Sequence, residues 1–126
     1  MAVGGYNDFA IKMWRGDDQQ ISIAVTDDAD APQDITGWDL WLTGKTAKTD
    51  LDAAAVFQLT IGSGITVVSA AGGTATALIA NDDTSGLSDD STVLYVDLQA
   101  KDGSGDIHTL QAGLITVYAD ITLAII

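Results

Sequence analysis

Two short acidic segments hold the side chains best suited to chemistry. In the first, Asp102, Ser104 and Asp106 alternate along the chain, which is the ligand spacing of a calcium-binding loop. The second holds three carboxylates, Asp27, Asp28 and Asp30. Clustered carboxylates suit a hard cation, but the bidentate Glu that completes a calcium loop is missing. We therefore favour Asx turns on an acidic surface over a calcium site, and we expect no metal or cofactor.

The chain has a single His, His108, and no Cys. A zinc site needs more such ligands, and a Ser-His-Asp triad is not supported by any Gly-x-Ser-x-Gly motif. We expect His108 to be a cross-strand side chain within a hairpin. An Asp-based glycoside hydrolase would need two carboxylates that face each other, and no pair of Asp residues stands out. The chain is therefore not expected to be an enzyme.

Three Gly-containing segments resemble binding motifs. Arg15-Gly16-Asp17 spells the integrin-binding tripeptide, but Gly and Asp are also typical turn residues. We expect a hairpin corner there, with Arg15 at the end of a strand. The segments at 62–64 and 103–105 both read Gly-Ser-Gly, and neither precedes a helix or a Lys. Hairpin turns, not phosphate-binding loops, are the prediction for both.

Aromatic and apolar residues outside the expected core are candidates for an interface. Trp38 fits the core, whereas Trp14 and Trp41 lie opposite the main apolar face of their strands. These two Trp residues belong either to a second core layer or to an exposed contact surface. The candidate interface residues are Tyr6, Trp14, Trp41, Ile125 and Ile126.

Alternating apolar and polar residues predict an all-β chain of about eight or nine short strands. One helical turn is expected near 81–87. Many strands separated by turns favour an antiparallel β-sandwich, immunoglobulin-like or jelly-roll-like. Residues 1–8 are expected to form an N-terminal arm and residues 9–126 a single domain. The strands are expected at 9–14, 20–26, 38–44, 56–61, 65–69, 74–80, 91–101, 106–111 and 114–126.

The composition limits the partners. The 126 residues have a net charge of −13, and all 18 acidic residues are Asp, which favours turns where Glu favours helices. Five scattered basic residues argue against nucleic acid and against an anionic membrane as partners. We see no membrane span and no signal peptide in the sequence.

An ordered series of turn and strand motifs resembles the N-terminal domain family of phage baseplate upper proteins and small stand-alone virion proteins with the same pattern. It covers roughly residues 9–122. The motifs are Arg15-Gly16-Asp17 between two strands, Pro32-Gln33-Asp34-Ile35-Thr36-Gly37, the segment 73–79, Tyr95-Val96-Asp97-Leu98, Asp102-Gly103, Thr109-Leu110 and Gly113-Leu114-Ile115-Thr116-Val117.

This resemblance implies a non-catalytic structural protein located in the virion. The family's long C-terminal region has no counterpart here, which favours a small capsid decoration (cement) or head-proximal protein. It would contact the major capsid protein or other virion proteins and form a homo-oligomer such as a trimer. A tail baseplate or fibre adaptor is the alternative. A rival of another class is a carbohydrate-binding module with Tyr6, Trp14 and Trp41 as a stacking platform.

Overall fold

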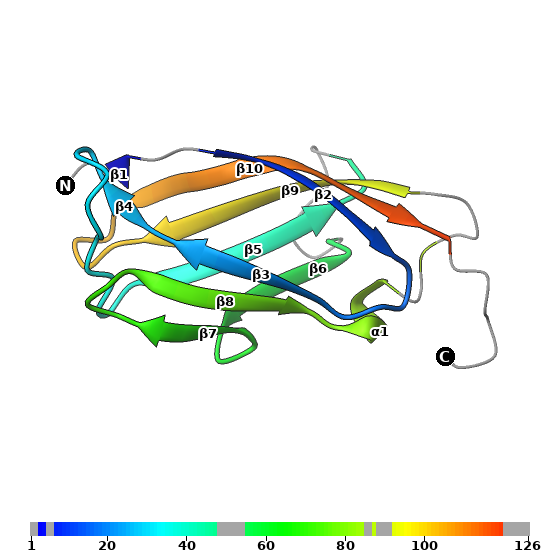
Figure 1. Ribbon diagram of the computed structural model, residues 1–126, viewed down its shortest axis with the longest axis horizontal. Coiled ribbons are helices and arrows are strands. Elements are labelled where there is room, and N and C mark those ends of the chain that lie inside the picture. The colour runs from blue at the N-terminus through cyan, green and yellow to red at the C-terminus, as the bar shows by residue number, and fades with distance from the viewer. Residues whose placement is uncertain (1–2, 5–6, 48–54, 85–86, 88–91, 120–126) are drawn as a thin grey trace.

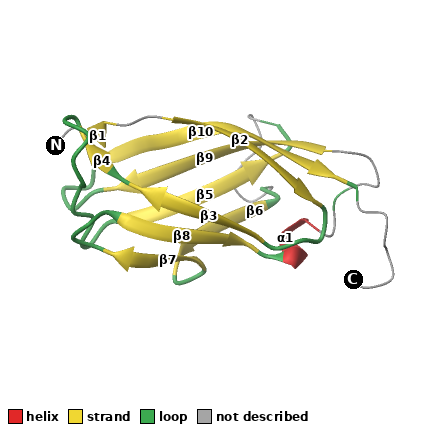
Figure 2. Cartoon of the chain, viewed as in Figure 1, coloured by secondary structure: helices red, strands yellow, loops and turns green. Residues whose placement is uncertain are grey.

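The computed structural model describes residues 3–4, 7–47, 55–84, 87 and 92–119 and shows an all-β chain (Figure 1). One eight-stranded sheet, in the order β2-β10-β9-β5-β6-β7-β8-β3, curls until it nearly closes into a barrel. Strands dominate, and the described helix is a single turn, α1 (Asn81–Thr84; Figure 2). The sheet contains β2 (Asn7–Trp14), β3 (Gln19–Ala24), β5 (Asp39–Lys45), β6 (Phe57–Ile61), β7 (Gly64–Ser69), β8 (Thr74–Ile79), β9 (Thr92–Lys101) and β10 (Ile107–Tyr118).

The all-β prediction is confirmed, but the predicted purely antiparallel arrangement is wrong. β10 pairs with β2 in parallel, and β6 pairs with β7 in parallel. The eight strands also form one curled sheet in place of two separate ones. The first and last strands of the barrel run in the same direction side by side, so a strand from each end of the described chain completes one wall.

Two short clasps hold the sheet edges β2 and β3 together, although these strands do not pair with each other in the sheet. At one end, residues 15–18 connect them directly, and the Arg15 N–H extends the pairing of β2 with β10 by donating to the Tyr118 carbonyl over 2.7 Å. At the other end, β1 (Val3–Gly4) pairs with β4 (Thr26–Asp27). Part of the expected N-terminal arm is therefore strand. The edges β2 and β3 are therefore connected at both ends of the barrel. Along the seam between them, no hydrogen-bonded ladder joins the two strands.

The interior follows the predicted alternation. Trp38, Leu40 and Leu42 are buried, as expected for one face of β5 and its entry. On β9 the alternate residues Val93 and Tyr95 are exposed. The other buried residues at alternate positions of these strands are Ile21, Ile23, Val25, Ala75, Ala77, Ile79, Leu94, Val96, Leu98, Ala100, Ile115 and Val117.

Two predicted turns differ from the structure. The Gly62-Ser63-Gly64 segment does not form a hairpin between antiparallel strands. It forms a tight coil, across which Thr60 pairs in parallel with Gly64. Positive φ angles at Gly62 (87°) and Gly64 (101°) permit this coil, because glycine has no Cβ to clash. The expected break at 112–113 is also wrong: β10 runs through it, and the irregularity is a bulge between Thr109 and Gln111.

Candidate functional site

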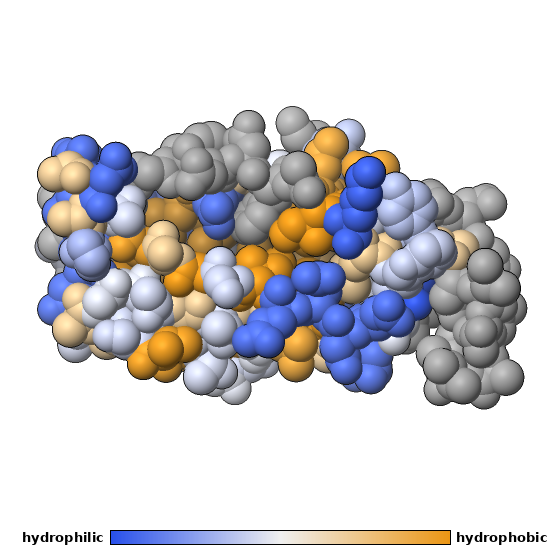
Figure 3. Space-filling model, viewed as in Figure 1, coloured by the Kyte–Doolittle hydropathy of each residue, from blue (hydrophilic) through white to orange (hydrophobic). Residues whose placement is uncertain are grey.

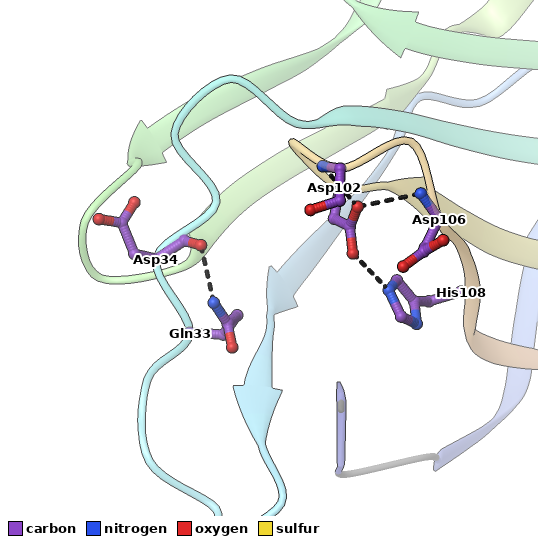
Figure 4. A network of polar contacts seen from close by, with 6 residues as sticks. Gln33, Asp34, Asp102, Asp106 and His108 are labelled. Atoms are coloured by element: carbon purple, nitrogen blue, oxygen red, sulfur yellow. Dashed lines mark hydrogen bonds and ion pairs between the residues drawn. The ribbon is translucent and has the colours of Figure 1, made fainter. Parts of the chain in front are cut away.

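The hairpin between β9 and β10 is built around the carboxylate of Asp102 (Figure 4). Its Oδ1 accepts hydrogen bonds from the backbone N–H groups of Ser104 (2.9 Å) and Asp106 (3.0 Å). Its Oδ2 lies 3.0 Å from Nε2 of His108, and the Asp102 side chain is only 3% exposed. The favoured Asx-turn interpretation is therefore confirmed for this segment.

His108 ties this hairpin to the barrel. Its ring stacks on the buried Trp38, with 6.1 Å between ring centroids and 19° between planes. The hydrogen bond from His108 is the main reason that the pKa of Asp102 lies below its ordinary value, with smaller contributions from the backbone N–H groups of Asp106 and Ser104. Burial opposes this lowering. The pair thus holds a charged carboxylate in a packed turn.

The arrangement at His108 does not assemble the parts of a triad. Nε2 is already bonded to Asp102, and Ser104 contributes its backbone N–H to that carboxylate. The structure gives no hydrogen bond between His108 and a serine hydroxyl in the described part of the chain. Within the same residues, no group of three or more His, Cys, Asp or Glu could hold a metal ion.

The carboxylates of the second acidic region also bind the backbone beside them. Oδ1 of Asp27 accepts from the N–H groups of Ala29 (2.9 Å) and Ala31 (3.1 Å). Asp34 accepts from both the hydroxyl and the N–H of Thr36, and these bonds lower its pKa. Next to it, Gln33 donates its side-chain N–H to the Asp34 carbonyl over 2.9 Å (Figure 4). These contacts are turn chemistry, as the sequence indicated.

Hydrogen bonds join the Arg-Gly-Asp corner and Asp18 to α1 and to Leu87. Arg15 is only 5% exposed and donates from Nη1 to the Leu87 carbonyl over 3.1 Å. The Gly16 N–H donates to the buried Thr84 hydroxyl over 2.9 Å, and Asp18 accepts from the Asn81 N–H over 2.7 Å. The corner joins two sheet edges, not two paired strands, so the predicted hairpin is wrong in this respect. A buried guanidinium is not presented for an adhesion receptor.

The candidate interface Trp residues lie far apart. Trp14 is half exposed on β2 and packs against Tyr118, with ring centroids 5.6 Å apart and planes inclined by 48°. Trp41 is half-buried on β5, at the level of Gln99 on β9. Measured along β9, Trp41 lies level with Gln99, whereas Trp14 lies beyond Thr92. The two rings are therefore separated by roughly 20 Å or more along the strands. Tyr6, Ile125 and Ile126 lie outside the described residues.

Trp14 instead belongs to an apolar surface that we call the outer patch. Four of its side chains are large, apolar and well exposed: Trp14 (50%), Val93 (45%), Leu114 (44%) and Tyr95 (38%). The outer patch covers the outer side of β2, β10 and β9. Its residues are Trp14, Val93, Tyr95, Leu114, Thr116 and Tyr118, with Lys12 and Lys45 at its margins.

Strand register makes the outer patch continuous. Lys12 pairs with Thr116 on one side, and Lys45 pairs with Tyr95 on the other. The alternation on β9 places Val93 and Tyr95 on an outer face, but only the register joins them to Leu114 and Trp14. The cross-strand pairs within the patch are Leu114 with Tyr95, Thr116 with Val93, and Tyr118 with Trp14.

Most of the Asp residues that the structure describes lie at the two ends of the barrel. On the face shown in Figure 3, strongly hydrophilic residues lie at the left-hand end and in a band that runs from the middle of the face toward the right. Asp97, in the middle of β9, and Asp8, on β2 at the level of Ala112, are the Asp residues of the described chain that lie along the walls. The end that carries α1 has Asp17, Asp18, Asp82 and Asp83. The hairpin end has Asp27, Asp28, Asp30, Asp34, Asp39, Asp102 and Asp106.

Comparison with models of known protein families finds no match for this chain, and a search of curated proteins finds none either. In the described part of the chain, no helix is long and apolar enough to cross a membrane. The described residues form an acidic, nearly closed β-barrel with a continuous apolar patch on the outer side of β2, β10 and β9.

Proposed function

We propose that this chain is a structural component of a bacteriophage particle that works through protein–protein contacts. The observation that carries this proposal is the outer patch. Aromatic residues are enriched at protein interfaces, and contiguous exposed apolar patches on soluble proteins are often contact sites. The ordered motif resemblance to phage virion proteins supplies the class of assembly. The His108–Asp102 pair serves the fold, and we assign it no catalytic role.

Our preferred role is a small capsid decoration or head-proximal protein that binds the major capsid protein or another virion protein. Walls that carry few charged residues, between ends rich in carboxylates, suit lateral contacts among copies on a particle surface. A baseplate or fibre adaptor is the alternative role. A nearly closed barrel and a sandwich both place two walls of strands around one core, so the sandwich body of the resembled proteins is compatible with this proposal.

Quantitative mass spectrometry of purified phage particles that encode this chain tests the proposal. We expect the chain to co-purify with intact particles at a fixed copy number. Hundreds of copies would support the capsid role, and a handful would support the tail role. Absence of the chain from particles that retain their other structural proteins would contradict the proposal in both forms.

A carbohydrate-binding module is the second candidate, and the Trp14–Tyr118 pair is the observation that favours it. Exposed aromatic rings can stack on a sugar, although Trp41 lies too far away to share the platform. A glycan array with the wild type and Trp14→Ala is the discriminating measurement. Saturable binding of one sugar class that is lost in the variant would replace the structural role as the main function.

A further inference from the structure

Two strand edges of this barrel have no strand partner along most of their length. Within the sheet, β2 pairs only with β10, and β3 pairs only with β8. The backbone N–H and C=O groups of a β-strand point to both of its sides, so roughly half of them on an edge strand point away from its paired neighbour. Between the two clasps, no backbone hydrogen bond joins the described residues of β2 to those of β3. The seam is therefore bordered by two rows of backbone groups that a further strand could bind.

The seam is also wider than the spacing of paired strands. Neighbouring strands in a sheet lie about 4.8 Å apart, so one intervening strand separates its two neighbours by roughly 9.6 Å. Along most of their length, the Cα atoms of β2 and β3 lie more than 8 Å apart. Figure 1 shows the two ribbons diverging from the corner at residues 15–18. Since β3 has six residues and β2 has eight, the seam approaches the width and has the length that one added strand of about six residues needs.

The two edges lack most of the features that keep added strands away. β2 and β3 contain no Pro, their ladders with β10 and β8 have no bulge, and β3 has no charged residue. The side chains of Met13, Ile21 and Ile23 on these strands are buried, whereas Lys12 and Ser22 are exposed. An added strand therefore needs apolar side chains on its inner face and polar side chains on its outer face.

Carboxylates lie at both ends of the seam. The exposed Asp17 and Asp18 belong to the corner at one end, and the exposed Asp28 and Asp30 follow β4 at the other. A strand with Lys or Arg at each of its ends would meet opposite charge at both ends of the seam. This chain has only five basic residues, and no two of them bracket a segment of about six residues. The occupant that fits the seam therefore comes from a different protein.

We infer that the seam between β2 and β3 binds an extended segment of a different protein, with alternating apolar and polar residues in its middle and basic residues at both ends. The corner reverses the chain between β2 and β3, so the added strand is parallel to one edge and antiparallel to the other. In this mode of recognition, main-chain hydrogen bonds supply affinity and the alternating side chains supply specificity. The contact is with strand edges and not with the outer patch, so the inference goes beyond the proposed function and does not depend on it.

Fluorescence anisotropy with a labelled synthetic peptide tests this inference. The probe has about six alternating Val and Thr residues flanked by a pair of Lys residues at each end. We expect saturable binding that weakens as the salt is raised to about 0.5 M. A probe with Asp in place of every Lys should bind at least about tenfold more weakly, because like charges then meet at both ends. A Lys-flanked probe with a central Pro should also bind at least about tenfold more weakly, because Pro has no N–H and does not fit between two paired strands.

Matched variants and hydrogen exchange then locate the site. Asp17→Asn and Asp28→Asn should each weaken binding about two- to fivefold. Asp39→Asn makes the same change in charge on β5, which pairs with neither edge strand, and should leave binding unchanged. The bound peptide should slow amide exchange in β2 and β3. The inference would be overturned by the absence of saturable binding up to about 1 mM peptide. Equal binding of the Pro-containing probe would also overturn it, and so would slowed exchange confined to other strands.

Discussion

At the residue scale, the Asp102 carboxylate organises more of its surroundings than any pattern in the sequence indicated. Spacing predicted that Asp102 sits in a turn, because Asp-Gly and Gly-Asp steps favour turns. The bond to His108 and the stacking of His108 on Trp38 were not predictable. They depend on how the hairpin folds back over the barrel end, and a linear pattern contains no information on that geometry.

Replacing Asp102 by Asn should make the fold less stable at neutral pH. The folded-state pKa of Asp102 is lowered, so its ionised form stabilises the fold above the ordinary value of 3.8, and this contribution is lost as the pH falls through the lowered value. Asp102→Asn should therefore melt several degrees below the wild type at pH 7, and the two should converge in acid. Asp106→Asn, a change in an exposed neighbour, is the control. A difference in melting temperature that persists unchanged in acid would contradict the assignment.

Arg15 is a structural residue in this fold. Arg15→Met removes the donor to the Leu87 carbonyl but keeps much of the aliphatic stem, so we expect a loss of about 1–3 kcal/mol in unfolding free energy. Urea denaturation measures this loss. The exposed Lys101 is the control, and Lys101→Met should stay within about 0.5 kcal/mol of the wild type. Equal stability of the Arg15 variant and the wild type would show that the hydrogen bond from Arg15 to the Leu87 carbonyl does not stabilise the fold.

At the scale of elements, alternation predicted which side of each strand faces inward but not which strands pair. Ile21, Ile23 and Val25 alternate with polar residues, and one face must be buried. Nothing local tells that β2 runs parallel to β10, because their residues are about a hundred positions apart. For the same reason, the sequence identified only part of the outer patch. Trp14 was a candidate, but only that pairing places it beside Tyr118 and on the same surface as Leu114.

The turn between β7 and β8 offers a test of close backbone packing. Gly73 has φ +71°, and a Cβ placed there would meet the carbonyl of Gln33 and lie 2.7 Å from that of Val25. Gly37 has φ +79° but nothing within 4 Å, so Gly37→Ala carries only the strain of the left-handed backbone, about 1–2 kcal/mol. Gly73→Ala should cost about 1–3 kcal/mol more in urea denaturation, because the backbone must move. Equal costs would show that this turn is loosely packed.

At the scale of the whole molecule, the seam between β2 and β3 is the least supported part of the barrel. β9 and β5 each pair with a strand on both sides, whereas β2 and β3 each pair on one side within the sheet. Local opening is easiest where backbone hydrogen bonds are fewest. The two clasps, residues 15–18 at one end and the β1–β4 ladder at the other, close the ends of the seam but leave its middle without a ladder.

Hydrogen exchange followed by NMR should therefore show the slowest amides in β9 and β5 and faster ones in β2 and β3 at low protein concentration. Equal protection of β2 and β9 at low concentration would mean that the seam is as firmly closed as the rest of the barrel.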